Sequence, residues 1–432
     1  MENWITAANA QKRVYEAVEG AIKSVENHDL VLFNLADDFK NVKALGESGG
    51  VRFPIEVYTG KSGAGGNNGG VEQNETVPRV DLQCAVAAVE NSEMTEMTDM
   101  LDNTGTGAGV WEDEATRRVR ECTENLAKRM QRYMCVSHGT GRVGVVDADT
   151  VASVSFVSSV KKAYCYGLAG IDANEKVDIY SSDTNPASHQ YLGVLIESVD
   201  YATGTCVTDT SMTLTEGWGV YLEGRFGLGI NGLRNLIDNG TNSLTIHGQT
   251  RADYPSALNS VVEDVYSGAN RVELNQDVLD KVINQVHFNG GRIEFFYGNS
   301  GVNNTFNRAN VTLRQYNTIS GKGPFKQQLG QADLGSYSHK GRTIPWYEET
   351  DDNALPGMLY GFSKGLLRKY VASPIKFMMK DGAMWSRAIG TNGRPVTGYQ
   401  AVAKCQMNIG IQKPSWAMAI NGLRDRGMGR DS

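Results

Sequence analysis

The sequence predicts an α+β fold with more than one packed region. A chain of 432 residues is long enough for two or three such regions. The class follows from a long amphipathic helix over 112–136, short alternating strands over 143–222, and a half-buried strand over 401–411. Helices and strands therefore occupy separate stretches of the chain, as in α+β proteins.

The composition is that of a globular protein and argues against several classes of function. Hydrophobic residues make up 40% and charged residues 21% of the chain, both ordinary values. The formal net charge is -7, so tight nucleic-acid binding by the whole chain is not expected, although a local basic patch is compatible with it. Six cysteines are scattered without a Cys-x-x-Cys pair, which favours free thiols over a zinc site.

Neither targeting nor membrane insertion is expected. The first residues lack the basic region and the apolar region of a signal peptide. No run of about 18 apolar residues occurs, so we expect no membrane-spanning helix.

The first predicted elements are helices followed by a long β-hairpin. Valine and isoleucine at helical spacing predict a helix over Ala7–Val25, and a second short helix is expected near Leu35–Leu45. Strands over Val51–Tyr58 and Val77–Val89 then flank Gly60–Gly70, where no apolar side chain is larger than alanine. At about 3.3 Å per residue this arm reaches roughly 40 Å. We expect it to need support from another molecule, and a second subunit is the natural candidate.

The clearest helix is predicted over Glu112–Val136, with a length of about 37 Å. Its arginines have two interpretations: a charged solvent face balanced by Glu121 and Glu124, or salt bridges to a neighbouring subunit. These arginines are Arg117, Arg118, Arg120, Arg129 and Arg132.

The later elements alternate in type. Turn signals separate short strands over 143–222, which predicts a small barrel or sandwich inserted in a larger fold. Asn275 is the predicted cap of a helix that ends at Asn289–Gly291. A buried strand over Ile293–Tyr297 and a polar helix over Asn303–Leu313 are expected to follow.

The glycine-rich motifs lack the context that nucleotide binding requires. Ile55 stands where a phosphate loop ending at Gly60-Lys61-Ser62 needs a glycine. Gly227–Gly232 matches a dinucleotide fingerprint, but the helix that can follow it is too short to present its N-terminus to a pyrophosphate. No histidine pair occurs at i,i+4 and no serine lies in a Gly-x-Ser-x-Gly turn. We therefore expect no catalytic residue, no cofactor and no metal site.

The order of these parts resembles the major capsid proteins of tailed bacteriophages, which have the Hong Kong 97-type fold. In that family an N-terminal arm, an extended loop, a spine helix and a central domain follow one another, and late strands return to the peripheral domain. Three late segments carry the resemblance most specifically: Asn275–Gly301, Gly341–Trp346 and Tyr399–Ala417. The stretch 143–222 departs from the minimal fold and looks like a small barrel inserted in some subfamilies.

The resemblance implies six regions. They are an N-terminal arm over 1–50, an extended β-hairpin loop over 51–90, a peripheral domain with the spine helix over 91–142, a β-rich, barrel-like insertion over 143–222, a central or axial domain over 223–335, and the rest of the axial domain with returning peripheral strands over 336–432.

The resemblance also implies a structural protein rather than an enzyme. Such a protein assembles in the host cytoplasm into hexamers and pentamers of an icosahedral head around double-stranded DNA, and it remains in the virion. The implied partners are further copies of the chain, a portal protein, a scaffold and a decoration protein, with only weak contact to DNA and no membrane. The candidate inter-subunit contacts are Lys61, Asn67 and Asn68 at the loop tip, and Arg117, Arg118, Arg120 and Arg129 on the long helix.

Two other interpretations stay open. A tail or surface-layer component also has high β content, but it forms tubes or flat lattices. A nucleotide-binding enzyme uses the Gly227–Gly232 turn and binds dinucleotides with micromolar affinity.

Overall fold

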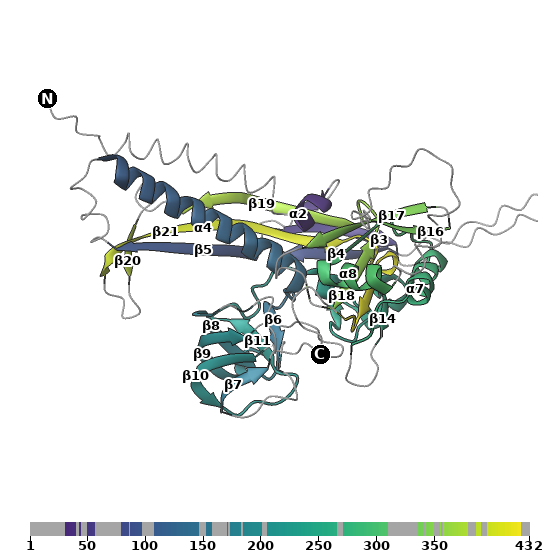
Figure 1. Ribbon diagram of the computed structural model, residues 1–432, viewed down its shortest axis with the longest axis horizontal. Coiled ribbons are helices and arrows are strands. Elements are labelled where there is room, and N and C mark those ends of the chain that lie inside the picture. The colour runs from purple at the N-terminus through teal and green to yellow at the C-terminus, as the bar shows by residue number, and fades with distance from the viewer. Residues whose placement is uncertain are drawn as a thin grey trace, which may run out of the picture. The chain divides into compact units, whose positions relative to one another are not determined.

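A computed structural model of the chain places its elements in two compact units (Figure 1). The larger unit comprises Leu35–Ala85, Arg132–Tyr370 and Ile409–Ser432, and the smaller unit comprises Met1–Asn34, Val86–Gln131 and Val371–Asn408. The residues that the structure describes are 31–39, 43–44, 50–56, 79–85, 87–96, 108–146, 153–157, 171, 173–182, 185–200, 205–265, 271–309, 336–340, 342–349, 355, 357–378, 386–389 and 395–424. The predicted helix over Ala7–Val25 lies outside them.

The larger unit is built around a six-stranded mixed sheet with the order β14-β22-β18-β15-β17-β16. The pairs β14–β22 and β15–β17 are parallel, and the other neighbours are antiparallel. β14 and β16 are therefore the two edges of this sheet. The strands are β14 (Val261–Asp264), β22 (Met418–Asn421), β18 (Met358–Phe362), β15 (Phe295–Asn299), β17 (Arg342–Glu349) and β16 (Ser336–His339).

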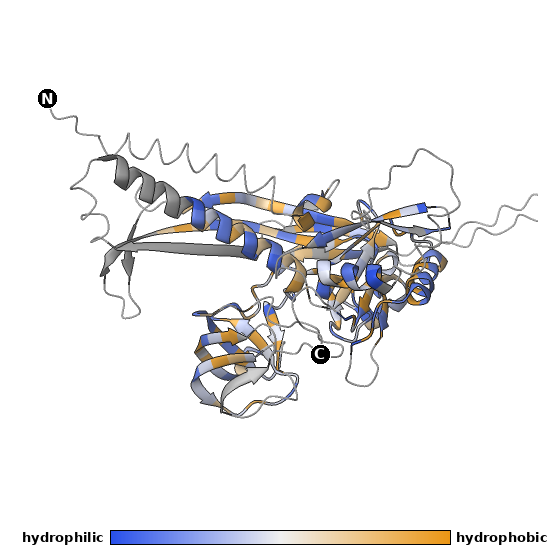
Figure 2. Ribbon diagram, in the orientation of Figure 1, coloured by the Kyte–Doolittle hydropathy of each residue, from blue (hydrophilic) through white to orange (hydrophobic). Residues whose placement is uncertain are grey.

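Helix α7 (Gln276–Phe288) packs against this sheet. The Asn275 side chain accepts a hydrogen bond from the Asp277 N–H at 3.1 Å, which confirms the predicted cap. Gly290 follows with a φ of +81°, a conformation that ends a helix at little cost for glycine. Hydrophobic and hydrophilic residues interleave along the helix (Figure 2). Its buried side chains are Leu279, Val282, Ile283 and Val286.

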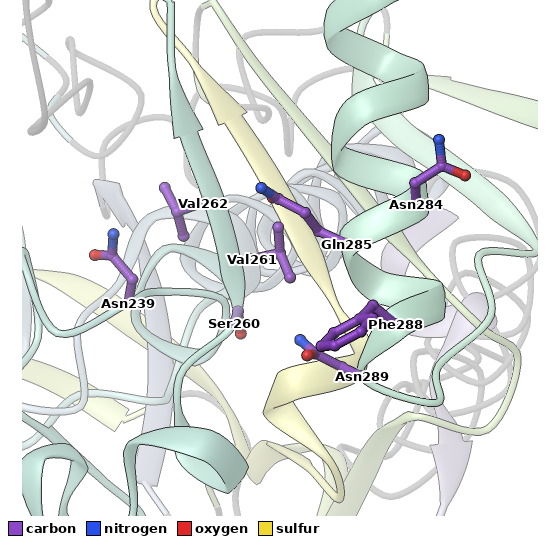
Figure 3. Close-up of a pocket in the computed structure, with 8 residues that line it drawn as sticks. All are labelled: Asn239, Ser260, Val261, Val262, Asn284, Gln285, Phe288 and Asn289. Carbon is purple, nitrogen blue, oxygen red and sulfur yellow. The ribbon is translucent and has the colours of Figure 1, made fainter.

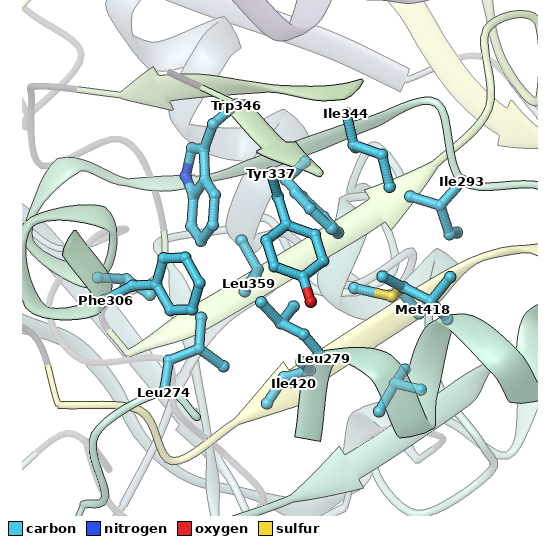
Figure 4. Packing of buried hydrophobic residues seen from close by; sticks show 14 of the residues in the cluster. Leu274, Leu279, Ile293, Phe306, Tyr337, Ile344, Trp346, Leu359, Met418 and Ile420 are labelled. Carbon is cyan, nitrogen blue, oxygen red and sulfur yellow. The ribbon is translucent and has the colours of Figure 1, made fainter. Parts of the chain in front are cut away.

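The core of the larger unit is an aromatic and aliphatic cluster between α7 and the sheet (Figure 4). The rings of Phe306 and Trp346 are stacked with centroids 5.9 Å apart, and Phe296 lies 5.3 Å from Trp346. Aromatic pairs in such arrangements add about 0.5–1.5 kcal/mol each to the burial of their area. Phe306 comes from α8 (Ser300–Ala309), so the predicted polar helix is present and begins three residues earlier than expected.

The β-rich stretch forms a separate antiparallel sheet with the order β6-β11-β8-β9-β10-β7. It has its own buried cluster, which includes Val177, Ile179, Val194 and Val220. Among the described strands no pairing joins the two edge strands β6 and β7, and closure into a barrel stays a prediction. The strands are β6 (Arg142–Val145), β7 (Ser153–Val157), β8 (Lys176–Tyr180), β9 (His189–Asp200), β10 (Thr205–Met212) and β11 (Gly219–Leu222).

The predicted hairpin is present at its base. β3 (Gly50–Glu56) pairs with β4 (Arg79–Ala85) in antiparallel register, with Gly50 opposite Ala85 and Glu56 opposite Arg79. A short strand, β2 (Lys43–Ala44), pairs on the other side of β3. The glycine-rich tip lies outside the described residues.

The expectation that this hairpin needs a second molecule for support is wrong for its base. Alternate side chains of β3 and β4 are buried within the larger unit, among them Phe53, whose ring lies 4.9 Å from Phe39 and 5.5 Å from His247. The Cys84 thiol donates to the Ile409 carbonyl at 3.4 Å. Because strand alternation places one apolar face inward, the chain covers that face with its own residues.

The helix expected near Leu35–Leu45 is also wrong. The helix α2 (Val31–Leu35) ends at the first residue of this stretch, and Asp37 and Asp38 form the strand β1, which runs parallel to β19 (Leu367–Phe377). Aspartate is a weak helix former, and Asp37 lies 3.5 Å from the guanidinium of Arg368. Pairing with a strand distant in sequence therefore overrides the local preference.

The smaller unit contains long paired strands and most of the long helix. β5 (Ala87–Glu96) runs antiparallel to β21 (Pro395–Ile411), which also pairs with β20 (Ser386–Ile389). β21 has the predicted alternation, with Ala401, Ala403, Cys405 and Met407 buried. The long helix is α4 (Ala108–Val136), and the predicted stripe is buried at Cys122, Leu126 and Met130.

Two further expectations can be compared with the described residues. The five cysteines among them are buried and form no disulfide, while Cys165 lies outside; the five are Cys84, Cys122, Cys135, Cys206 and Cys405. No helix in the described part of the chain has the length and apolarity needed to cross a membrane.

Candidate assembly surfaces

The structure describes only part of the contact set predicted from the sequence. Lys61, Asn67 and Asn68 lie outside the described residues. Arg117 and Arg118 belong to α4, but their side chains are not described. These positions stay predictions.

The two remaining arginines lie on different sides of α4. Arg120 is exposed and Arg129 is partly buried. At about 100° per residue, the nine steps from Arg120 to Arg129 amount to two and a half turns, so their side chains leave the helix in opposite directions. A single flat contact surface therefore cannot use both arginines.

A groove of about 530 Å³ opens along the β14 edge of the large sheet (Figure 3). β14 and the C-terminal half of α7 form its walls, and the segment after α5 (Leu233–Leu236) closes one end. The lining residues are uncharged: Asn239, Ser260, Val261, Val262, Asn284, Gln285, Phe288 and Asn289.

The backbone of β14 explains why this edge is open. The Val261 and Val265 N–H groups donate toward β22, to the carbonyls of Ala417 and Asn421 at 3.0 Å. Since successive residues of a strand face opposite sides, Val262 and Asp264 direct their N–H and C=O groups away from β22. In the part of the chain that the structure describes, no strand pairs with that side. Such an edge is a template for strand pairing with another chain.

An apolar ring stands at the end of this groove. Phe288 is the last residue of α7, and its side chain is 92% exposed. An exposed aromatic side chain beside an open strand edge is typical of a surface that becomes buried on association. The sequence analysis assigned Phe288 no role, because it falls just outside the buried stripe of α7.

The opposite edge of the sheet carries a cluster of titratable groups. The Asp280 carboxylate accepts hydrogen bonds from the Tyr337 hydroxyl at 2.8 Å and from the His339 Nδ1 at 2.6 Å. His339 is buried, and its Nε2 has no hydrogen-bond partner. Burial, followed by the hydrogen bond to Asp280, raises the pKa of Tyr337. These two hydrogen bonds hold β16 against α7.

The turn after β16 is basic. Lys340 is exposed and its Nζ donates to the Asn284 Oδ1 at 2.6 Å, and Arg342 is exposed on β17. His287 lies beside them, with its ring centroid 5.9 Å from that of His339. Burial, followed by the electrostatic effects of His339, Lys340 and Arg342, lowers the pKa of His287.

Sequence reasoning missed this cluster for a physical reason. His287 and His339 are far apart in the sequence and belong to a helix and a strand. A search for metal pairs at helical spacing does not detect residues that only tertiary packing brings together. Among the described residues, no group of three histidine, cysteine, aspartate or glutamate side chains is placed to hold a metal ion.

A buried polar network shapes the segment that closes the groove. The Arg251 guanidinium donates to the carbonyls of Asn235 at 2.6 Å and Asp238 at 2.9 Å, and also to that of Leu258. Burial lowers the pKa of Arg251 to about 10, so the side chain stays charged at neutral pH. It satisfies backbone carbonyls that the short helix α5 leaves without partners.

The Gly227–Gly232 turn packs against the chain's own backbone. A Cβ atom on Gly229 would lie 2.4 Å from the Gly141 nitrogen, and one on Gly232 would lie 2.6 Å from the Ser137 oxygen. The glycines therefore allow a close crossing of two backbone segments. The segment Ser137–Gly141, which follows α4, thus occupies the space beside Gly229 and Gly232.

Comparison with known proteins identifies a likeness at the level of structure. No protein-family model and no curated protein matches the sequence. A chain from the structure described as the cyanophage A-1(L) capsid asymmetric unit aligns with a TM-score of 0.50 and 10% sequence identity, over 91% of this chain and 93% of that chain. The chain has a phage-capsid fold. This bears out the predicted Hong Kong 97-like fold at the coarse level, whereas the six predicted regions and the barrel-like insertion stay predictions.

Two other solved structures align less closely and carry no weight in that conclusion. A chain from Gordonia phage Cozz gives a TM-score of 0.41 with 9% identity, over 91% of this chain and 86% of that chain. A chain from the virus-like particle of Pyrococcus furiosus gives 0.39 with 8% identity, over 94% and 98%.

Proposed function

We propose that this chain is a major capsid protein of a tailed bacteriophage, which assembles into hexamers and pentamers of an icosahedral head around double-stranded DNA. The observation that carries the proposal is the fold likeness to a cyanophage capsid chain over 91% of this chain and 93% of that chain. The protein remains in the virion after assembly in the host cytoplasm.

The parts of the fold have natural roles in this proposal. α4 serves as the spine helix, and the large sheet with α7 serves as the axial domain. The hairpin of β3 and β4 is the rooted base of an extended loop whose tip carries Lys61, Asn67 and Asn68. The six-stranded sheet over 142–222 is a barrel-like insertion.

Shell stability comes from many modest contacts in this proposal. Head-to-tail contacts close into rings, so each subunit presents two different, complementary surfaces. Copies that each carry a formal charge of -7 repel at long range, and their contacts must juxtapose local patches of opposite sign. The same negative charge favours only weak contact with packaged DNA. A portal protein, a scaffold and a decoration protein are the further partners.

The first test is microscopy of the purified full chain. We expect closed polyhedral particles in negative stain. Helical tubes or flat lattices instead support a tail or surface-layer component, and a protein that stays monomeric at every concentration contradicts the proposal.

The second test concerns the loop tip. Deletion of Gly63–Asn68 is expected to block particle formation, while the monomer keeps its circular dichroism spectrum and its unfolding transition, because the paired base from Gly50 to Ala85 is anchored in its own unit. The control replaces the same residues by serine and so keeps the length of the loop. Normal particles from the deletion argue against a role of the tip in assembly.

A further inference from the structure

The two edges of the large sheet carry charges of opposite sign. β14 ends in Glu263 and Asp264, and the turn that joins β16 to β17 contains Lys340 and Arg342. We propose that the β14 edge of one copy receives the β16–β17 edge of a second copy, with Phe288 as the apolar anchor of the contact. This inference rests on the proposed function, because it names the surfaces through which copies of the chain meet.

The acidic edge has a charge available for a partner. The Glu263 carboxylate forms a salt bridge with Lys281, whose Nζ lies 2.5 Å away. Asp264 is exposed, and its carboxylate accepts only the Asn421 side-chain N–H at 2.7 Å. Within the described part of the chain, no cation pairs with Asp264. The same residue directs its backbone groups to the open side of β14.

The basic edge is equally available. Lys340 contacts a neutral amide rather than a carboxylate, and Arg342 is exposed with no ion pair among the described residues. The carboxylate of Asp280 is directed at Tyr337 and His339 instead. The turn therefore presents two positive charges that the described chain does not neutralise.

The two edges cannot meet within one copy. They lie at opposite ends of the six-stranded sheet, and α7 lies between them, because Lys281 reaches β14 while Asp280 contacts β16. Each edge is thus available only to another molecule. Two different surfaces of one subunit that fit each other give a head-to-tail contact, which closes into a ring.

The groove accounts for the apolar part of the contact. Val261 and Val262 line it next to Phe288 (Figure 3). A strand added at Val262 and Asp264 satisfies the open backbone groups and covers the exposed ring. Backbone pairing, one buried aromatic side chain and a charged rim together match the usual composition of a protein interface.

A charge-swap experiment with the full chain tests the contact. The first variant carries Asp264→Lys, the second carries Lys340→Glu with Arg342→Glu, and the third combines all of these changes. We expect each of the first two to raise the concentration needed for particle formation by about tenfold or more, because like charges then face each other. The combined variant is expected to return to within about threefold of the original protein, since attraction is restored with reversed signs. Light scattering and negative-stain microscopy provide the readout.

The control carries Glu197→Lys on β9, an exposed position of the separate antiparallel sheet, and is expected to assemble like the original chain. The edge contact is wrong if the original chain forms particles and all variants assemble alike. It is also wrong if the combined variant needs as high a concentration to assemble as the first two variants. In both cases the proposed function stands. If the original chain forms no regular assembly, both are wrong. Recovery in the combined variant also shows that the single changes do not act by unfolding the protein.

Discussion

Single buried residues fix the loops around the large sheet, and His247 is the clearest example. Its Nε2 accepts the N–H of Ile411 at 3.2 Å, where β21 ends. The ring is buried against Phe53. Burial, followed by the positive charge of Arg251, lowers the pKa of His247 to about 3. The imidazole is therefore neutral in the folded protein over the ordinary range of pH.

This pKa predicts a loss of stability in acid. Unfolded histidine has a pKa of about 6.5, so the unfolded chain takes up a proton below that value while folded His247 does not. The contribution of His247 to the free energy of unfolding is complete above pH ~6.5. It falls as the pH is lowered towards 3, and the loss at pH 4 is roughly 3 kcal/mol. Urea unfolding between pH 4 and 8 measures the slope.

The matched variants separate His247 from the rest of the chain. His247→Gln keeps an acceptor for the Ile411 N–H without titrating, so its unfolding free energy is expected to depend less on pH. His189→Gln, at an exposed position, is expected to leave the slope unchanged. Equal slopes in all three proteins contradict the assignment.

At the scale of elements, glycine permits the crossing between the end of α4 and the start of α5. Gly232 has a φ of -104°, so its backbone conformation is open to any residue. Its constraint is steric, because a Cβ would lie 2.6 Å from the Ser137 oxygen and 2.8 Å from the Ser137 nitrogen. Gly227 has a φ of +75° and nothing within 4 Å of its Cβ position. Two glycines of one motif are thus required for different reasons.

Alanine substitutions distinguish these reasons. Gly232→Ala is expected to lower the free energy of unfolding by about 3 kcal/mol, since backbone must move to accept the methyl group. Gly227→Ala is expected to cost only about 1–2 kcal/mol, the penalty of a left-handed conformation. Denaturant unfolding measures both. A larger loss for Gly227→Ala contradicts the packing at Gly232.

At the scale of the whole molecule, the antiparallel sheet with the order β6-β11-β8-β9-β10-β7 has a buried core of its own. The chain enters and leaves it through adjacent antiparallel strands, with Val145 opposite Gly219. The Val146 and Trp218 backbones are joined by a hydrogen bond of 2.9 Å. Neighbouring ends and a separate buried cluster are typical of a domain inserted into a host fold.

This organisation predicts that the insertion folds alone. A fragment from Gly141 to Glu223 is expected to unfold in one cooperative transition, with a β-type circular dichroism spectrum. The control carries Val220→Asp, which places a charge in the buried cluster and is expected to abolish the transition. A gradual, non-cooperative melt of the unaltered fragment contradicts an independent domain.

The sequence by itself determined most of the described helices and strands, with the exception of Leu35–Leu45, and it determined which of their faces are buried. The stripe of α7, the Asn275 cap and the alternation of β21 follow from periodicity and local hydrogen bonding. These features depend on residues within one or two turns of each other. The order of the elements was also enough to predict the fold family.

Only the tertiary structure decided what each buried face packs against and which edges remain open. Alternation placed one face of β3 inward, but it did not reveal that Phe53 is covered by Phe39 and His247 of the same chain. The proximity of His287 and His339, and the open edge of β14 beside Phe288, likewise have no local signal. Periodicity indicates that a side chain is buried. Which residue it packs against depends on contacts between residues distant in the sequence.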